Sequence, residues 1–544
     1  MRAMTFRTLG LAFLAAFLLL SQGALSTPGS AAALTFYVDA SGGADGNDGL
    51  TPATAWQSLA KVNSSTLAPG TNVLFKRGET WRGQLMPASG AVGAPVTYGA
   101  YGSGNKPLLL GSVSAGQPGD WVAEGANIWR SQQVFAVDVG NIIFDGAAAF
   151  GIKKWSAPTL TSQGDYWYDR ATGYVRMYST ANPASLHANI ELALRKHIID
   201  QTNASYVTYD GLALKYGAAH GIGGGGTHDI TVRNCEISYI GGGDLNQDGS
   251  NIRFGNGIEF WGNAHDNLVE RCKIWEIYDT ALTNQNHTQT ALQYNITYRN
   301  NLIWNAAYAS FEYWSRPAAS QTNNIRFENN TAAYAGRGWG TQRPDPVGAH
   351  VLLGGNYAAT QSILIRDNVF YEATGAGLLT TTASSQWITS LTEDYNCWYQ
   401  SSAPVAVLYE LNLSYTMAQF AAYQSFTGKG AHSIVADPKL ANASGADLRL
   451  LVGSPCIDAG IDVGSGPDFD GVARPQGSQV DIGAFEYRPA PVGGIAVAPD
   501  RAALPARTPE PAGGRHTTSV GLAAALAGSI AIAAGGWYMR RRRM

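Results

Sequence analysis

Apolar and polar residues alternate with a period of two in short stretches through the middle of the chain, as in Ile230–Ile237 and Ile363–Phe370. Successive side chains of a β-strand point to opposite faces, whereas an amphipathic helix repeats its apolar positions every three or four residues. Each stretch carries a polar or small residue where a bend is expected. The pattern predicts strands rather than helices.

These stretches are copies of one repeated sequence pattern. Six of them align so that one small or polar residue shares a column at intervals of 37, 29, 29, 38 and 29 residues, namely Cys235, Cys272, Asn301, Asn330, Asn368 and Cys397. A repeat of this length indicates stacked units. Stacked coils lie about 4.8 Å apart, so an asparagine amide at the bend can bond to the coils on both sides. A β-propeller would have four strands per period and no such ladder, so we expect a solenoid.

A second strand precedes each repeated line. Its aligned triplets are Gly221–Gly223, Gly257–Glu259, Ala281–Thr283, Ser310–Glu312, His350–Leu352 and Gly377–Leu379. The middle residue is apolar throughout, so we expect it to point inward and both of its neighbours to point outward. Glu259 and Glu312 then share one outward column, two coils apart, with Thr283 between them.

The two glutamates are candidate catalytic residues. Two coil steps separate their backbones by about 9 to 10 Å, which brings the carboxyls near the roughly 6.5 to 9.5 Å spacing of inverting glycosidases. Asp279 adds a third carboxylate, and neighbouring carboxylates raise one another's pKa so that one can act as an acid. A single outward glutamate is usually a solvated surface residue, and Asp279 can instead cap a turn. The shared column favours the catalytic interpretation.

Candidate substrate-binding residues surround the glutamates. Trp261 and Trp314 each follow a glutamate by two positions, and an exposed indole packs well on the apolar face of a sugar ring. Gln285 and His350 can hydrogen-bond hydroxyl groups, although His350 is equally compatible with a structural role. Arg316 lies close to Trp314 in sequence.

The two ends of the repeat region resemble those of a known superfamily. Phe36–Gly49, with Trp56–Lys61 after it, resembles the opening of many pectin-lyase-like right-handed β-helix proteins, and Ser454–Gly460 and Asp481–Tyr487 resemble their closing segment. The resemblance covers residues 34–488 and implies an all-β, right-handed parallel β-helix. It does not fix the reaction, because the superfamily includes lyases, glycosidases, esterases and non-enzymatic adhesins.

Residues 110–193 interrupt the repeat. Alternating aromatic residues flank a turn at Asp169–Gly173, which predicts a β-hairpin-rich insertion on the solenoid.

The ends of the chain carry export and anchoring signals. Residues 1–33 have two arginines, an apolar run and a small-residue site, which predicts a signal peptide rather than a retained helix. Residues 519–539 lack charges and precede four arginines in 540–544, which predicts a transmembrane anchor with a cytoplasmic tail. Residues 489–518 are proline-rich and form the expected spacer, which makes a buried core helix a poor alternative. Such tails also resemble surface-sorting signals, in which case the anchor is removed.

Charge and length limit the partners of the exported part. Without the arginines of the two terminal segments, 31 basic residues remain against 40 acidic ones, a formal charge of −9. A surface of this sign disfavours nucleic acid and, more weakly, a polyanionic substrate. We expect a polysaccharide partner and the membrane as contacts; the sequence does not indicate an oligomeric state.

One loop has the spacing of a calcium site. Asp244, Asn246 and Asp248 follow the D-x-N-x-D-G pattern, but Gly255 replaces the glutamate expected at the twelfth position, so a turn without an ion is the stronger alternative. Hydrolysis itself requires no cofactor. Cys235 and Cys272 are neighbours in the ladder and are compatible with either a disulfide or two free thiols.

Three functions remain open. The first is a glycoside hydrolase that uses Glu259, Glu312 and Asp279. The second is a polysaccharide lyase, which needs a basic residue and a cation beside a uronate. The third is a non-catalytic surface protein that binds glycans. The few lysines on the outward face favour hydrolysis.

Overall fold

The computed structural model describes residues 33–489 except for residues 288, 346, 355–358 and 382–383. The predicted signal peptide, nearly all of the spacer, the apolar segment at 519–539 and the basic tail lie outside the described residues. Within the described part, no helix combines the length and apolar character needed to cross a bilayer.

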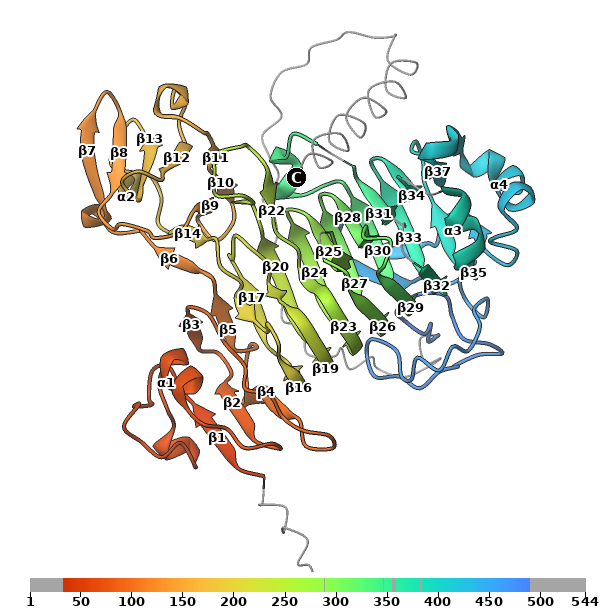
Figure 1. Cartoon of the computed structure of the whole chain (residues 1–544), viewed down its shortest axis with the longest axis horizontal. Coiled ribbons are helices and arrows are strands. Elements are labelled where there is room, and N and C mark those ends of the chain that lie inside the picture. Colours follow the sequence, from red (N-terminus) through yellow and green to blue (C-terminus); the bar gives the residue numbers. More distant parts are fainter. Residues whose placement is uncertain (1–32, 288, 346, 355–358, 382–383, 490–544) are drawn as a thin grey trace, which may run out of the picture. The chain divides into compact units, whose positions relative to one another are not determined.

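Each turn of the chain contributes three strands. One coil consists of β25 (Thr280–Asn286), β26 (Leu292–Arg299) and β27 (Leu302–Ala306), and the next of β28 (Ala309–Ser315), β29 (Gln321–Glu328) and β30 (Thr331–Ala335). Every strand pairs in parallel with the strand at the same place in the following coil. This pairing of successive repeats confirms the predicted parallel β-helix (Figure 1).

The first and second strands of the coils form one large sheet. Besides those named, it contains β1 (Thr35–Val38), β2 (Asn72–Lys76), β4 (Val96–Tyr101), β15 (Ile199–Asp200), β16 (Ser205–Asp210), β18 (Ile222–Gly223), β19 (Gly225–Arg233), β23 (Ile258–Glu270), β31 (Ala349–Gly354), β32 (Ala359–Arg366), β34 (Ala376–Thr380), β35 (Leu391–Asp394), β37 (Ala406–Leu408) and β38 (Leu413–Tyr415). All of its pairings except β37–β38 are parallel among the described residues.

The third strands form the second sheet of the solenoid. It contains β27 and β30 together with β3 (Thr80–Arg82), β5 (Leu108–Leu110), β17 (Ala213–Lys215), β20 (Glu236–Ile240), β24 (Lys273–Ile277), β33 (Val369–Ala373), β36 (Cys397–Tyr399) and β39 (Ile434–Val435). The two sheets enclose a single apolar core that runs along the stacked coils.

The core confirms which residues of the aligned triplets point inward. Their middle residues all belong to the core cluster, namely Ile222, Ile258, Leu282, Phe311, Val351 and Leu378. The expectation that the preceding residue points outward is wrong at Ala281, which also lies in this cluster.

The asparagine ladder is present at the bend between the two sheets. The Oδ1 atom of Asn330 accepts a hydrogen bond from the backbone N–H of Asn301 at 2.9 Å, and Asn368 does the same for Asn330 at 2.9 Å. The last rung is Asn396, whose Oδ1 accepts from the N–H of Asn368 at 3.0 Å. Our alignment of Cys397 with this column is therefore wrong by one residue.

The reason for the shift lies in the backbone before each rung. The preceding residue has a positive φ in every coil, for example 53° at Asn300 and 54° at Tyr395. Cys397 instead pairs with Val369 as the first residue of the next strand. All four cysteines are buried free thiols, which resolves the alternatives for Cys235 and Cys272 in favour of thiols.

The segment between β5 and β15 forms two small sheets outside the coil. One contains β6 (Ser112–Ser114), β9 (Val139–Phe144), β10 (Ala149–Phe150) and β14 (Ile190–Leu194); the other contains β7 (Trp121–Gly125), β8 (Ile128–Ser131), β11 (Ile152–Lys153), β12 (Asp165–Asp169) and β13 (Tyr174–Tyr178). β12 and β13 are antiparallel, and Gly173 donates to the carbonyl of Asp169 at 2.7 Å to close the turn.

Short elements complete the described chain. The helices are α1 (Leu59–Ser64), α2 (Pro183–Leu186), α3 (Ser384–Ser390) and α4 (Phe420–Thr427); the remaining strands are β21 (Gly243–Asp244), β22 (Arg253–Phe254), β40 (Leu440–Asn442) and β41 (Asp447–Leu450). The C-terminal segment packs on the second sheet, where Ala484 and Phe485 lie in one cluster with Leu302 and Ala333.

Candidate active site

The strand register places the two candidate glutamates in one column. Glu259 of β23 pairs with Thr283 of β25, and Thr283 pairs with Glu312 of β28. The residues on both sides of each glutamate lie in the core, so the glutamates face outward. We call Glu259, Thr283 and Glu312 the acid column. The next residue in register is Leu352, where the polar part of the column ends.

Glu259 is held as a carboxylate. Its side chain is 7% exposed, and its Oε1 lies 3.2 Å from Nε2 of His220. The Asn256 amide donates to Oε2 at 2.5 Å. Burial alone raises the pKa of Glu259, but the interactions with His220 and Asn256 outweigh burial and lower the pKa below its ordinary value. Glu259 is therefore ionised near neutral pH.

His220 and His197 belong to this site and were missed by our sequence reading. The two imidazole rings stack with centroids 4.8 Å apart and an interplanar angle of 12°. Burial lowers the pKa of His197 to about 4, so it is uncharged near neutral pH. His220 immediately precedes the first aligned triplet, and extending the alignment by one column brings it together with Asn256 and Thr280.

Three neutral groups donate hydrogen bonds to Glu312. The Thr280 hydroxyl donates to Oε2 at 2.8 Å and the Gln285 amide donates to the same atom at 2.9 Å. The indole N–H of Trp314 donates to Oε1. The residue is 2% exposed, so the carboxyl lies in a nearly dry environment. Gln285, expected to bind substrate, is therefore placed against a catalytic candidate.

A chain of hydrogen bonds joins the two glutamates. Asn256, which donates to Glu259, accepts through Oδ1 from the backbone N–H of Thr280 at 3.0 Å. The Thr280 hydroxyl then donates to Glu312. The geometry of either carboxylate thus depends on residues that also hold the other.

Asp279 is paired with a buried arginine. Arg343 donates through one terminal NH to Oδ1 of Asp279 at 3.0 Å, and its Nε lies 3.1 Å from Asp345. Its guanidinium lies 4.0 Å from the ring centroid of Tyr308. These contacts tie the loop that contains Asp345 to the strand that follows Asp279.

The aromatic residues share a second outward column. Trp261, Gln285 and Trp314 are in register, and the guanidinium of Arg316 lies 4.8 Å from the Trp314 ring centroid. Our expectation of an exposed indole is wrong for Trp314, which is 1% exposed because it is packed beneath neighbouring side chains and bonded to Glu312. Trp261 is half-buried.

His350 lies inside the solenoid. Its Nδ1 is 3.1 Å from the Ser310 hydroxyl, and its ring is 5.5 Å from that of Phe370 in the second sheet. Burial lowers its pKa to about 3, so the ring is neutral. The prediction that His350 faces the substrate is wrong, because its side chain is fully buried against the second sheet.

Two of the predicted calcium ligands, Asp244 and Asp248, have partners within the protein. Asp244 is fully buried and forms an ion pair with Arg170, and it also accepts from the backbone N–H of Gly249 at 3.0 Å. Asp248 accepts from the N–H of Ser250 at 2.7 Å. Among the described residues, no three or more His, Cys, Asp or Glu side chains are arranged to hold a metal.

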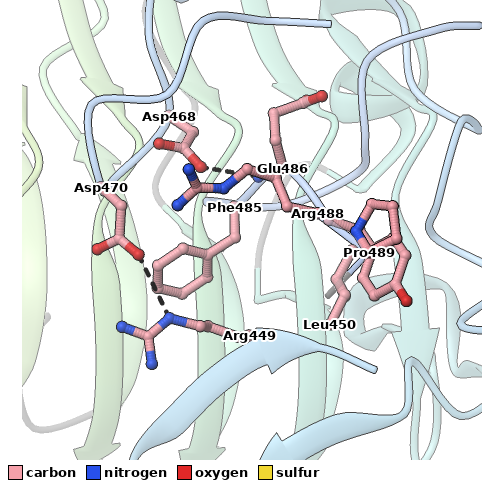
Figure 2. A pocket seen from close by; sticks show the side chains of 9 residues that line it. Arg449, Leu450, Asp468, Asp470, Phe485, Glu486, Arg488 and Pro489 are labelled. Atoms are coloured by element: carbon pink, nitrogen blue, oxygen red, sulfur yellow. Dashed lines mark hydrogen bonds and ion pairs between the residues drawn. The ribbon is translucent and has the colours of Figure 1, made fainter. Parts of the chain in front are cut away.

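A recess of about 350 Å³ lies at the C-terminal segment, away from the acid column (Figure 2). Its carboxylates are already bonded: Asp468 accepts from the backbone N–H of Glu486 at 2.9 Å, and Asp470 accepts from Nε of Arg449 at 3.3 Å. The contacts hold the closing segment together.

No protein-family model and no curated protein matches this chain. Solved structures similar to it include one described as a glycoside hydrolase, at 10% identity over 69% of this chain and 89% of that one, with a TM-score of 0.45. Pectate lyase Pel9A is 13% identical over 85% of this chain and 98% of that one, with a TM-score of 0.42. A family 28 exopolygalacturonase of Yersinia enterocolitica is 13% identical over 71% and 70%, with a TM-score of 0.34.

Proposed function

We propose that this chain is an exported carbohydrate-active enzyme, a glycoside hydrolase that cleaves a polysaccharide with Glu259 and Glu312. The acid column carries the proposal. Two outward carboxylates stand two coils apart, with about 9.6 Å between their backbones, and an inverting mechanism requires roughly 6.5 to 9.5 Å between the carboxyl groups that these side chains carry. The same column supplies a threonine between them.

The environments of the glutamates suggest their roles. Glu259, whose pKa is lowered, acts as the general base because it remains ionised. Glu312, the other carboxyl of the acid column, acts as the general acid, and the Thr280 hydroxyl beside it can reverse its role and accept a hydrogen bond from the protonated form. Asp279, held by Arg343, anchors the adjacent loop rather than exchanging a proton.

We expect the attacking water to bind beside Thr283. Its Oγ1 is buried and has no hydrogen-bond partner among the described residues. Buried hydroxyl groups are nearly always satisfied by protein, water or ligand. An inverting glycosidase holds its water between the base and the sugar, and this hydroxyl lies between the two glutamates.

The proposal is tested with E259Q and E312Q on a panel of polysaccharides. We expect each variant to lose about 10² to 10⁴-fold in kcat because one proton transfer is removed. E236Q is the control, since Glu236 pairs with Lys106 on the second sheet at 2.8 Å. Unchanged activity of E259Q and E312Q would refute the assignment. T283V should lower kcat with little change in KM.

The products separate hydrolysis from the alternatives. Hydrolysis creates reducing ends without new ultraviolet absorbance, whereas a lyase also creates an unsaturated uronate that absorbs. Binding without either signal across the panel would support a glycan-binding protein and overturn the enzyme proposal. Arg343, a cation near the acid column, is already shared by Asp279 and Asp345, which favours hydrolysis over elimination.

We further propose that the enzyme acts outside the cell while attached to the membrane by residues 519–539. The signal peptide, proline-rich spacer and terminal arginines of the sequence support this location. Truncation after residue 518 should move the protein from the membrane fraction to the medium. Retention of the truncated protein in the membrane would refute the anchor.

A further inference from the structure

The histidine that contacts Glu259 has a fixed tautomer. Nδ1 of His220 accepts a hydrogen bond from the backbone N–H of Asn256 at 2.9 Å. A ring nitrogen that accepts from an amide carries no proton, so the proton of neutral His220 is on Nε2. Nε2 lies 3.2 Å from Oε1 of Glu259 and donates to it.

His220 is itself held from behind. Its backbone N–H donates to Nδ1 of His197 at 3.3 Å, and the two rings stack. The Phe254 ring meets His220 edge-on at 5.2 Å. These contacts fix the direction of the Nε2–H bond without using the atom that faces Glu259.

A glycine leaves room for the ring pair. Gly223 follows Ile222, which pairs with Ile258 of the next coil, and Gly223 is therefore in register with Glu259. A Cβ atom at Gly223 would lie 2.9 Å from Cδ2 of His220 and 3.0 Å from Nδ1 of His197. Only a residue without a side chain allows both imidazoles to occupy the space beside the acid column.

We propose that His220 is a positioning residue that orients the Glu259 carboxylate. The inference rests on the proposed role of Glu259 as general base. Burial opposes the charge on Glu259, and a directed N–H donor offsets part of that cost. The arrangement lets a nearly dry carboxylate act as a base below neutral pH.

Removal of the donor should change a pH profile. In H220L the acidic limb of kcat/KM should move to higher pH by about 1 to 2 units, and kcat should fall about 10-fold or more while KM changes little. H220Q places an amide donor near the position of Nε2. The acidic limb of its kcat/KM profile should therefore return most of the way to the wild-type pH. H432Q is the control, because His432 is an exposed histidine paired with Asp394.

The shift is attributed to Glu259 only if its other neighbours are accounted for. The titratable groups that act on it are His220, His197 and Tyr298, with Glu312 two coils away. H197L removes the second imidazole and serves to separate its effect from that of His220.

G223A tests the same geometry without removing a donor or an acceptor. The added Cβ should displace the ring pair and reproduce part of the limb shift of H220L. G46A is its control, because a Cβ at Gly46 meets nothing within 4 Å.

Two spectroscopic readouts are independent of catalysis. In the full-length chain, ¹⁵N-labelled His220 should show the Nε2–H tautomer, and the ¹³C signal of the Glu259 carboxyl should titrate at higher pH in H220L than in wild type. If E259Q is inactive but H220L keeps the wild-type profile, the positioning role is overturned while the proposed function stands. If E259Q is fully active, the proposed function fails, and an unchanged Glu259 titration in H220L would overturn the positioning role as well.

Discussion

The asparagine ladder should carry a measurable share of stability, and Asn330 is one of its fully buried inner rungs. The Asn330 side chain accepts from the backbone N–H and the amide of Asn301, at 2.9 and 3.0 Å. It donates to the carbonyl of Tyr298 at 3.0 Å and to Oδ1 of Asn368 at 3.1 Å. N330A removes all four hydrogen bonds in a fully buried place.

The expected loss follows from these contacts. A typical hydrogen bond contributes about 1 kcal/mol net, and a buried donor left without an acceptor costs about 1 to 3 kcal/mol. N330A should therefore lower the free energy of unfolding by about 4 to 6 kcal/mol. N330D should be at least as damaging, because a carboxylate cannot donate to the Tyr298 carbonyl.

Chemical denaturation followed by circular dichroism measures the effect. The control is N323A in the same strand, β29, where Asn323 is exposed and the expected change is below about 0.5 kcal/mol. Equal denaturation midpoints for N330A and N323A would refute the view that the ladder amides hold adjacent coils together.

Three further predictions concern charge. Burial raises the pKa of Asp367 to about 7, so the protonated side chain contributes to stability below about pH 4, and this contribution is lost as the pH rises to 7. In urea denaturation, the free energy of unfolding of the wild type should fall by up to about 4 kcal/mol over that range because of this group, and D367N should not show the fall. R343L should cost about 3 to 5 kcal/mol because it leaves Asp279 buried without its cation, and D279N should recover part of the loss in the double variant. Because Arg170 occupies Asp244, neither calcium nor a chelator should move the melting temperature, and a rise of several degrees with calcium would contradict the observed pairing.

Much of the fold could be predicted because the side chains of each coil follow one repeated pattern. Period-two alternation predicted the strands, and the apolar centre of each triplet gave the register that brings Glu259, Thr283 and Glu312 together. The column at the bend failed at its last member because Cys397 matched earlier cysteines, while the backbone places Asn396 there.

The surroundings of the glutamates were harder to predict. Burial of Trp314 depends on how successive coils and their connections pack over it, which no local pattern encodes. His350 lies inside the solenoid beside Phe370, whereas strict alternation places it on the outer face. His220 escaped notice since it precedes the aligned triplet and its importance appears only when its partner in space, Glu259, is known.

In the bend ladder, the number of residues in a coil does not determine the spacing between coils. Successive rungs fall 29 residues apart from Cys272 to Asn330 but 38 residues apart from Asn330 to Asn368, although the asparagine bonds have nearly the same length. Part of the surplus lies in the connection between β30 and β31, which includes Arg343 beside the acid column. Evolution can therefore lengthen a connection and reshape what reaches the glutamates while the height of every coil stays the same. In such a scaffold, the lining of the candidate site can change while the fold is kept.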